Sequence, residues 1–114
     1  MKELFNANIV YLAFLDKKTN IINFPYQYGE DMPPQNLGEG LTSKIISSGK
    51  ALLINKDIEE VTLQLGAKRI GIPSASYLGV PIFRGKEAIG VLSVQSTETE
   101  NRFNEGDSNL LSTI

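Results

Sequence analysis

The chain has 114 residues, of which 41% are apolar and 21% charged, so its size and composition fit a single soluble, cytoplasmic domain. Its 11 basic residues are scattered among 13 acidic ones, which excludes a stripe that neutralises a phosphate backbone and hence a nucleic-acid partner. It contains no cysteine and no histidine, which excludes disulfides, thiolate catalysis and the usual ligands of zinc and haem.

The first predicted element is a strand over Ile9–Leu15. This run is apolar on both alternating faces and is therefore typical of a central strand that is covered on both sides. It is far shorter than the roughly 20 residues of a membrane-spanning helix, so we expect no membrane insertion by this segment. Residues 21–28 are expected to return as the hairpin partner. Pro25 cannot donate a ladder hydrogen bond and indicates that this second strand has a free side.

A loop and a short helix are predicted next. Residues 29–40 are rich in glycine and proline and read as a loop. Residues 41–48 then predict a short helix, because Gly49 stands where a helix-ending glycine belongs. The apolar run Ala51–Ile54 predicts a short buried strand.

A second short helix is predicted from its capping pattern. Asp57 and Glu60 have the spacing of a capping box, with aspartate in place of serine or threonine. Apolar residues then mark one helical face at Ile58, Val61 and Leu65. Residues 68–74 are expected to form a loop.

The strongest hairpin signal lies in the second half of the chain. Two apolar runs, Ser76–Phe83 and Ala88–Gln95, are joined by a short polar, glycine-containing turn. Pro81 inside the first run predicts a sheet edge or a bulge. Asn104 is expected to cap a last helix, with an acidic first turn and an apolar stripe formed by Leu110, Leu111 and Ile114.

Together these segments resemble the GAF domain family. Ser76–Ile82 matches the family's S-x-L-x-V-P-I strand, Gly90–Leu92 its G-V-L strand, and Phe103 with Asp107 its F-x-x-x-D motif at the terminal helix. Gly38–Leu41 and the stretch after it resemble the family's G-x-G-L segment. The resemblance covers the whole chain except the N-terminal helix, of which Met1–Asn6 would be only the end.

The resemblance implies an α+β, profilin-like fold. Such a fold has an antiparallel sheet of five or six strands with the terminal helices on one face. Short helices and loops on the other face enclose a small-molecule pocket. We expect one GAF-like domain over residues 1–114, truncated at its N- and C-terminal helices. A sensor of the PAS type is the alternative fold, and the hairpin containing Val80-Pro81-Ile82 favours the GAF type.

The resemblance also bears on cofactors. GAF-like domains that bind cyclic nucleotides carry an Asn-Lys-Phe-Asp-Glu signature; Phe103 and Asp107 match it, but Ser108 replaces the glutamate. Bilin-binding members need cysteine and histidine, and haem-binding members need an axial histidine. The free methionine sulfoxide reductase branch uses cysteine. We therefore expect no haem, bilin, metal or cyclic nucleotide, no catalytic residues and no enzymatic activity.

The remaining expectation is an ordinary pocket with a few polar groups that orient a small-molecule ligand. Its candidate contacts are the hydroxyl, guanidinium and amide side chains of Tyr26, Tyr28, Arg69, Ser74, Ser76, Ser93 and Gln95. Each has a plainer interpretation as a strand residue, a solvated cation or a serine bonded to backbone.

The predicted function is that of a small-molecule-sensing regulatory domain. It would belong to a larger signalling protein, such as a histidine kinase or a transcriptional regulator, and would relay the state of its ligand through the terminal helices. We expect a homodimer formed through these helices. The alternative is a ligand-free structural dimerisation module whose pocket is filled by side chains.

Overall fold

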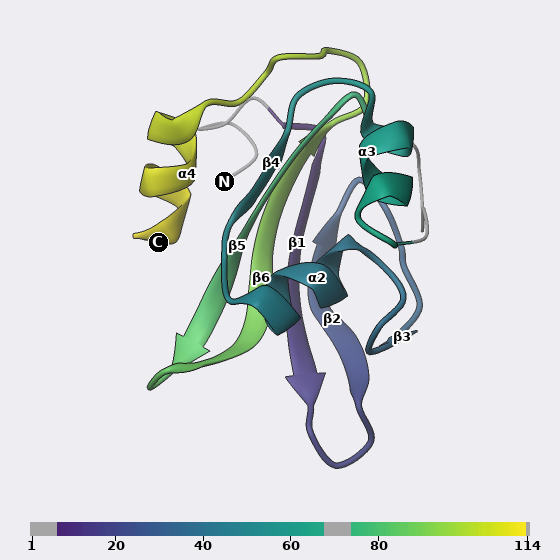
Figure 1. Cartoon of the computed structure of the whole chain (residues 1–114), viewed down its shortest axis with the longest axis vertical. Helices are drawn as coiled ribbons and strands as arrows, with labels where there is room; N and C mark the ends of the chain where they lie inside the picture. Colours follow the sequence, from purple (N-terminus) through teal and green to yellow (C-terminus); the bar gives the residue numbers. More distant parts are fainter. Residues whose placement is uncertain (1–6, 68–73, 114) are drawn as a thin grey trace.

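A six-stranded antiparallel sheet forms the centre of the protein (Figure 1). The computed structural model describes residues 7–67 and 74–113. The strands follow the order β3–β2–β1–β6–β5–β4 across the sheet. Their bounds are β1 Ile9–Asp16, β2 Ile21–Tyr28, β3 Gln35–Asn36, β4 Leu52–Ile54, β5 Ser76–Arg84 and β6 Glu87–Ser96. The six strands confirm the predicted α+β fold.

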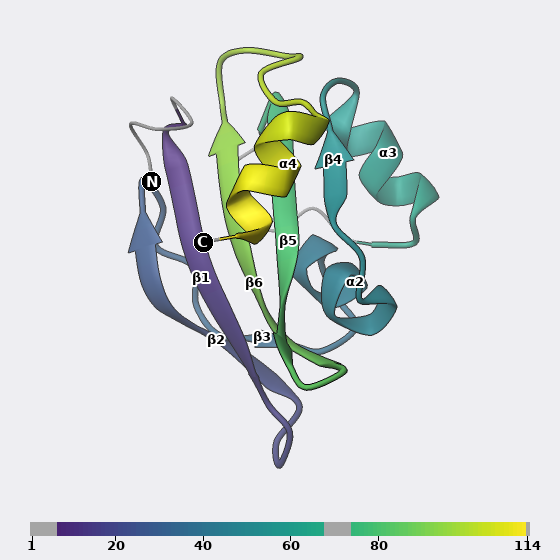
Figure 2. The ribbon, with the colours of Figure 1, turned by 90° about the vertical axis from the view of Figure 1, so that its left-hand side faces the viewer.

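Helices cover both faces of this sheet (Figures 1 and 2). One face, here the α4 face, carries α4 (Glu105–Ser112) on a core formed by Ala7, Val10, Leu78, Val80, Leu92, Val94, Phe103 and Leu111. The opposite face, here the α2/α3 face, carries α2 (Leu41–Ser48) and α3 (Ile58–Gln64) on a core formed by Tyr11, Ala13, Ile22, Met32, Ile45, Ile46, Ile54, Tyr77 and Val91. β1 contributes to both cores, which confirms that it is a central strand covered on both sides.

Both predicted hairpins are confirmed, and both prolines lie where the sheet pairing is interrupted. The register between β1 and β2 shifts between Leu12 and Phe14, opposite the segment that holds Pro25. β3 pairs with Ile21 and Ile22 alone among the described residues, so β2 has its predicted free side at Pro25. Pro81 pairs with β6, whereas β4 stops at Gly79 on the other side. Each proline therefore sits at a local edge, where its missing N–H costs no ladder bond.

The ends of α2 and α4 also follow the prediction. Gly49 ends α2 in the left-handed conformation (φ 68°), and its N–H donates to the Ile45 carbonyl over 2.8 Å. Asn104 caps α4 through a reciprocal pair of hydrogen bonds with Asp107, each 2.9 Å long. Leu111 is buried, but Leu110 is 44% exposed, so the expected apolar stripe is narrower than predicted. Ile114 lies outside the described residues.

The predicted capping box at α3 is wrong. Asp57 precedes the helix in the left-handed conformation (φ 51°), and its side chain makes no capping hydrogen bond. Its backbone N–H donates instead to a carboxylate oxygen of Glu100, 3.3 Å away, which comes from a distant part of the chain. Leu65 is a partly exposed residue at the end of α3. A long-range contact thus decides this helix start.

Two further segments bear on the predictions. The short strand β3 lies within the segment expected to be loop only. Residues 1–6 and 68–73, which hold the end of the expected N-terminal helix and most of an expected loop, lie outside the described residues. In the part of the chain that the structure describes, no helix has the length and apolar character needed to cross a membrane.

Candidate functional site

Four buried hydroxyl groups meet on the α2/α3 face, and we call Tyr11, Thr42, Tyr77 and Ser93 the hydroxyl cluster. Tyr11 Oη shares one hydrogen bond with Thr42 Oγ1 and another with Tyr77 Oη, both 2.6 Å long. Tyr11 comes from β1, Tyr77 from β5 and Thr42 from the first turn of α2. The cluster therefore ties two strands to the helix above them.

Burial sets the electrostatics of this cluster. Tyr11 is 2% exposed and Tyr77 is 3% exposed. Burial raises the pKa of Tyr11, although its hydrogen bonds to Thr42 and Tyr77 lower it in part. Burial also raises the pKa of Tyr77 well above its ordinary value, and the neighbouring Tyr11 raises it further. Both phenols are therefore neutral at physiological pH.

Ser93 is the incomplete member of the cluster. It is fully buried on β6, where its cross-strand neighbours are Tyr11 and Gly79. Its Oγ has no hydrogen-bond partner among the described residues. It lies close enough to the two phenols to lower their pKa values, but without the geometry of a hydrogen bond. A buried hydroxyl in this state costs about 1–3 kcal/mol, so Ser93 calls for a functional explanation.

Gly79 makes room for the cluster. A Cβ placed on Gly79 would lie 2.9 Å from Tyr77 Oη, 3.0 Å from Tyr77 Cε1 and 2.5 Å from Ile45 Cδ1. The Tyr77 ring and the end of Ile45 therefore occupy the space that a side chain at this position would fill. The Tyr77 ring therefore covers Gly79, which is the cross-strand neighbour of Ser93 on the α2/α3 face.

The polar strip continues along β6 to Gln95. Ser74 Oγ donates to Gln95 Oε1 over 2.5 Å, and Gln95 is the cross-strand neighbour of Tyr77. Gln95 is 7% exposed. Within the described residues no group of three or more acidic, cysteine or histidine side chains could hold a metal ion. Along this strip the described polar groups are the hydroxyls of the cluster and of Ser74, and the amide of Gln95.

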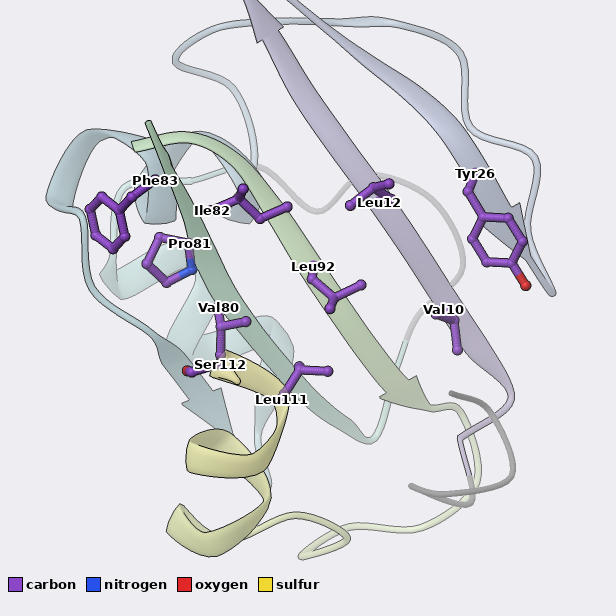
Figure 3. A pocket seen from close by; sticks show the side chains of 10 residues that line it. All are labelled: Val10, Leu12, Tyr26, Val80, Pro81, Ile82, Phe83, Leu92, Leu111 and Ser112. Atoms are coloured by element: carbon purple, nitrogen blue, oxygen red, sulfur yellow. The ribbon is translucent and has the colours of Figure 1, made fainter. Parts of the chain in front are cut away.

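A second feature is an apolar cavity of about 490 Å³ on the α4 face (Figure 3). It lies on the face opposite to the one where the small-molecule pocket was predicted, so it is a different feature from that pocket. Apolar side chains from four strands and α4 make up most of its lining, which consists of Val10, Leu12, Tyr26, Val80, Pro81, Ile82, Phe83, Leu92, Leu111 and Ser112. Figure 3 shows Tyr26 on β2 and Phe83 on β5 at opposite ends of this surface.

The structure separates the predicted site residues into two groups. Ser93 and Gln95 lie on the α2/α3 face, and Ser74 is bonded to Gln95. Tyr26 and Tyr28 face the other way, because they are the cross-strand neighbours of Leu12 and Val10. Arg69 lies outside the described residues.

Ser76 serves the start of α4 and has no place in either site. Its Oγ donates to the Thr99 carbonyl over 2.7 Å and accepts from the Arg102 N–H over 3.2 Å. Asn55, which follows β4, holds the same region: its side chain donates to the Phe103 carbonyl over 2.7 Å and accepts from the Phe103 N–H over 3.2 Å. These bonds connect the sheet beside Tyr77 to the segment that leads into α4.

Sequence reasoning missed Tyr11, Thr42 and Tyr77. Tyr11 carries the only side-chain hydroxyl in the apolar run Ile9–Leu15, and that isolated polar group was an available signal. Nothing local marks Thr42, which reaches the cluster only because α2 packs on β5 and β6.

Several solved structures share this fold, and three of them represent the range of proteins that have it. Free methionine-R-sulfoxide reductase from Neisseria meningitidis, solved with its substrate, has a TM-score of 0.82 at 21% identity, covering 98% of this chain and 65% of that one. The GAF domain of the Acinetobacter phosphoenolpyruvate-protein phosphotransferase has a TM-score of 0.81 at 18% identity, with coverages of 98% and 69%. A methyl-accepting chemotaxis protein fragment, residues 122 to 287, has a TM-score of 0.80 at 17% identity, with coverages of 98% and 75%. At these identities the likeness shows the fold alone.

The reductases overturn the expectation that this chain has no enzymatic activity. That expectation rested on the missing cysteine and histidine, yet enzymes are built on this same fold. The physical reason is that a scaffold does not separate enzymes from binding domains, since function depends on the side chains that line its site. Here those side chains are tyrosine, threonine and serine hydroxyls, which are chemical groups that enzymes also use.

Sequence comparisons identify the family. Nitrogen fixation protein AnfA from Azotobacter vinelandii is 30% identical over 81 residues, which are 68% of this chain and 15% of AnfA. The chain thus spans a small part of that relative and slightly less than two thirds of the Neisseria reductase. The family model described as "GAF domain" matches residues 1–114. On this match and on the six-stranded fold, the chain belongs to the GAF domain family.

Proposed function

We propose that this chain is a regulatory sensory domain that binds a small molecule on the α2/α3 face. The observation that carries the proposal is the buried Ser93 hydroxyl without a hydrogen-bond partner among the described residues. A group of this kind is stabilised when a ligand supplies the missing partner. The likeness to a chemotaxis protein fragment and to AnfA supports a regulatory role.

The ligand state would reach the rest of the parent protein through α4. Ser76 adjoins Tyr77 in β5 and bonds to the backbone of Arg102, while Asn55 clamps Phe103 directly before α4. A shift of β5 at the hydroxyl cluster therefore moves the start of α4. A parent such as a histidine kinase or a transcriptional regulator would read this movement, because a ligand that prefers one arrangement shifts the equilibrium between the two.

Native mass spectrometry of the purified protein tests this function. We expect wild type to retain a small molecule that denaturation releases, and Ser93→Ala to retain less of it. Ser108→Ala on α4, far from the cluster in the fold, is the matched control and should retain as much as wild type. Wild-type protein that never carries such a molecule, and that binds nothing from a metabolite library, would contradict the proposal.

The broken cyclic-nucleotide signature supports a narrower expectation. Ser108 stands in α4 where the glutamate of that signature belongs. We expect neither cyclic AMP nor cyclic GMP to bind in the micromolar range. Isothermal calorimetry on the wild-type protein checks this, and stoichiometric binding would contradict it.

The alternative function is a ligand-free dimerisation module. The observation that favours it is the α4 face, where Tyr26 and Phe83 are more than half exposed at the ends of the apolar cavity. In that case the Tyr77 ring permanently fills the space over Gly79. A stable dimer that retains no small molecule and binds none from the library would support this function over the sensor.

A further inference from the structure

The hydrogen-bond count of the hydroxyl cluster does not balance. Four hydroxyl groups bring four donor hydrogens, whereas two hydrogen bonds join their oxygens. Two hydrogens are therefore left without an acceptor among the described residues, and Ser93 is the residue with no partner at all. Tyr77 adds to the excess, because its phenol brings one more hydrogen and not only an acceptor.

Replacing the Tyr77 phenol by a carbonyl balances the count. Thr42 can donate to Tyr11, and Tyr11 can then donate to a carbonyl oxygen in the position that Tyr77 Oη occupies, 2.6 Å away. The second lone pair of that oxygen is free to accept from Ser93, the direct cross-strand neighbour of Tyr11. All three remaining donors then have an acceptor.

The Tyr77 ring occupies the space that such a group would need, so the group would have to replace this ring. The ring lies over Gly79, where a Cβ would be 3.0 Å from Tyr77 Cε1. Gly79 is also the cross-strand neighbour of Ser93. A ring-sized group that took the place of Tyr77 would thus contact both the glycine backbone and the Ser93 hydroxyl.

We propose that the hydroxyl cluster binds an uncharged, ring-sized molecule through a carbonyl oxygen, and that this molecule displaces the Tyr77 side chain. The inference rests on the proposed function and names its ligand class. Burial holds both phenols of the cluster neutral, and the Glu30 carboxylate raises the pKa of Tyr11 further. The site therefore favours an uncharged acceptor over an anionic one. Because Ser76 adjoins Tyr77 and bonds to Arg102, displacement of Tyr77 couples directly to the α4 segment.

Tyr77→Ala tests the class of ligand, because it vacates the space that the ligand would fill. The probes are acetophenone, which has a ring and a carbonyl, and ethylbenzene, which lacks the carbonyl. We expect Tyr77→Ala to bind acetophenone and Tyr77→Ala/Ser93→Ala to bind it about tenfold more weakly, the equivalent of one hydrogen bond of about 1.4 kcal/mol. Ethylbenzene should bind both variants equally.

Leu78→Ala is the matched control, since Leu78 is a fully buried neighbour that points to the α4 face. Adding Ser93→Ala to the Leu78→Ala variant should not change its affinity for either probe. Equal weakening of both probes by Ser93→Ala in the Tyr77→Ala background would overturn the inference, and so would no weakening of acetophenone.

A wild-type measurement decides the matter if Tyr77→Ala does not fold. Saturating acetophenone should raise the nitration of Tyr77 by tetranitromethane several-fold, while the nitration of the exposed Tyr26 stays constant. Unchanged Tyr77 nitration, with acetophenone bound or unbound, would overturn the inference. A retained cellular ligand that leaves Tyr77 protected would overturn this inference alone and leave the proposed sensory function intact.

Discussion

Tyr77 is the residue that should govern the pH dependence of stability. Burial raises its pKa, and that of Tyr11, above the ordinary value. Above about pH 10 the unfolded chain loses phenolic protons that the folded protein keeps, so the free energy of unfolding falls as pH rises. Below that pH both states keep these protons and the contribution is complete. We expect Tyr77→Phe to lose less stability than wild type as the pH rises above about 10.

Urea denaturation at a series of pH values measures this difference. Tyr26→Phe, at an exposed tyrosine on the other face, is the matched control and should follow wild type. A Tyr77→Phe variant whose stability falls as steeply as that of wild type would show that the buried phenol does not cause the alkaline loss.

Gly79 should tolerate no side chain while Ile45 and Tyr77 keep their places. A Cβ there would lie 2.5 Å from Ile45 Cδ1, so we expect Gly79→Ala to lower the free energy of unfolding by about 1–3 kcal/mol. Ile45→Val removes the atom that clashes, so Gly79→Ala should cost less in that background. A double-mutant cycle measures this coupling, and strictly additive costs would refute the steric explanation.

At the scale of elements, α4 depends on its N-terminal cap. The Asn104 side chain accepts from the Asp107 N–H, and the Asp107 carboxylate accepts from the Asn104 N–H. We expect Asn104→Ala to lower the free energy of unfolding by about 1 kcal/mol. Asn109→Ala, at an exposed position within the same helix, is the matched control and should change stability by much less. Equal effects of the two substitutions in thermal unfolding would argue against the cap.

The Asn55 side chain holds the segment before α4 through two hydrogen bonds to the backbone of Phe103. We expect these bonds to couple movements of the sheet to α4. Asn55→Ala removes both side-chain hydrogen bonds to Phe103. We expect faster backbone hydrogen exchange in residues 101–107 of this variant, with β1 and β6 unchanged, because local opening follows the lost contacts. Uniformly faster exchange over the whole chain would instead indicate general destabilisation.

At the scale of the whole molecule, the α4 face should mediate self-association. Tyr26 is 52% exposed and Phe83 is 51% exposed at the two ends of the cavity, and Leu110 is exposed on α4. Burying apolar surface yields about 25 cal/mol per Å², so pairing of this face with a second copy is favourable. We expect weak dimers that Tyr26→Ser/Phe83→Ser disrupts.

Analytical ultracentrifugation over a range of concentrations checks the association. Leu63→Ser is the matched control, because Leu63 is 71% exposed on α3 and belongs to the opposite side of the sheet. A strictly monomeric wild type at high concentration, or dimers weakened by Leu63→Ser alone, would contradict an interface on the α4 face.

The sequence by itself determined the family and every described helix and strand except the short strand β3. Some signals depend only on residues that are neighbours in the sequence, so they can be predicted without the fold. Examples are the apolar run of β1, Gly49 at the end of α2 and Asn104 at the start of α4. The same holds for the hairpin between β5 and β6. The prediction at Asp57 was wrong, because its backbone bonds to Glu100 from another part of the chain.

Only the tertiary structure decided the candidate site. The register of β1, β6 and β5 brings Tyr11, Ser93 and Gly79 side by side across the sheet. The pairing of β2 with β1 places Tyr26 and Tyr28 on the opposite face. Alternation along β2 predicts only that the two tyrosines share a face, not which face it is. Alternation fixes which residues share a face within one strand, but pairing between distant strands fixes which of them meet. A buried hydroxyl without a partner can be recognised only after that pairing is known.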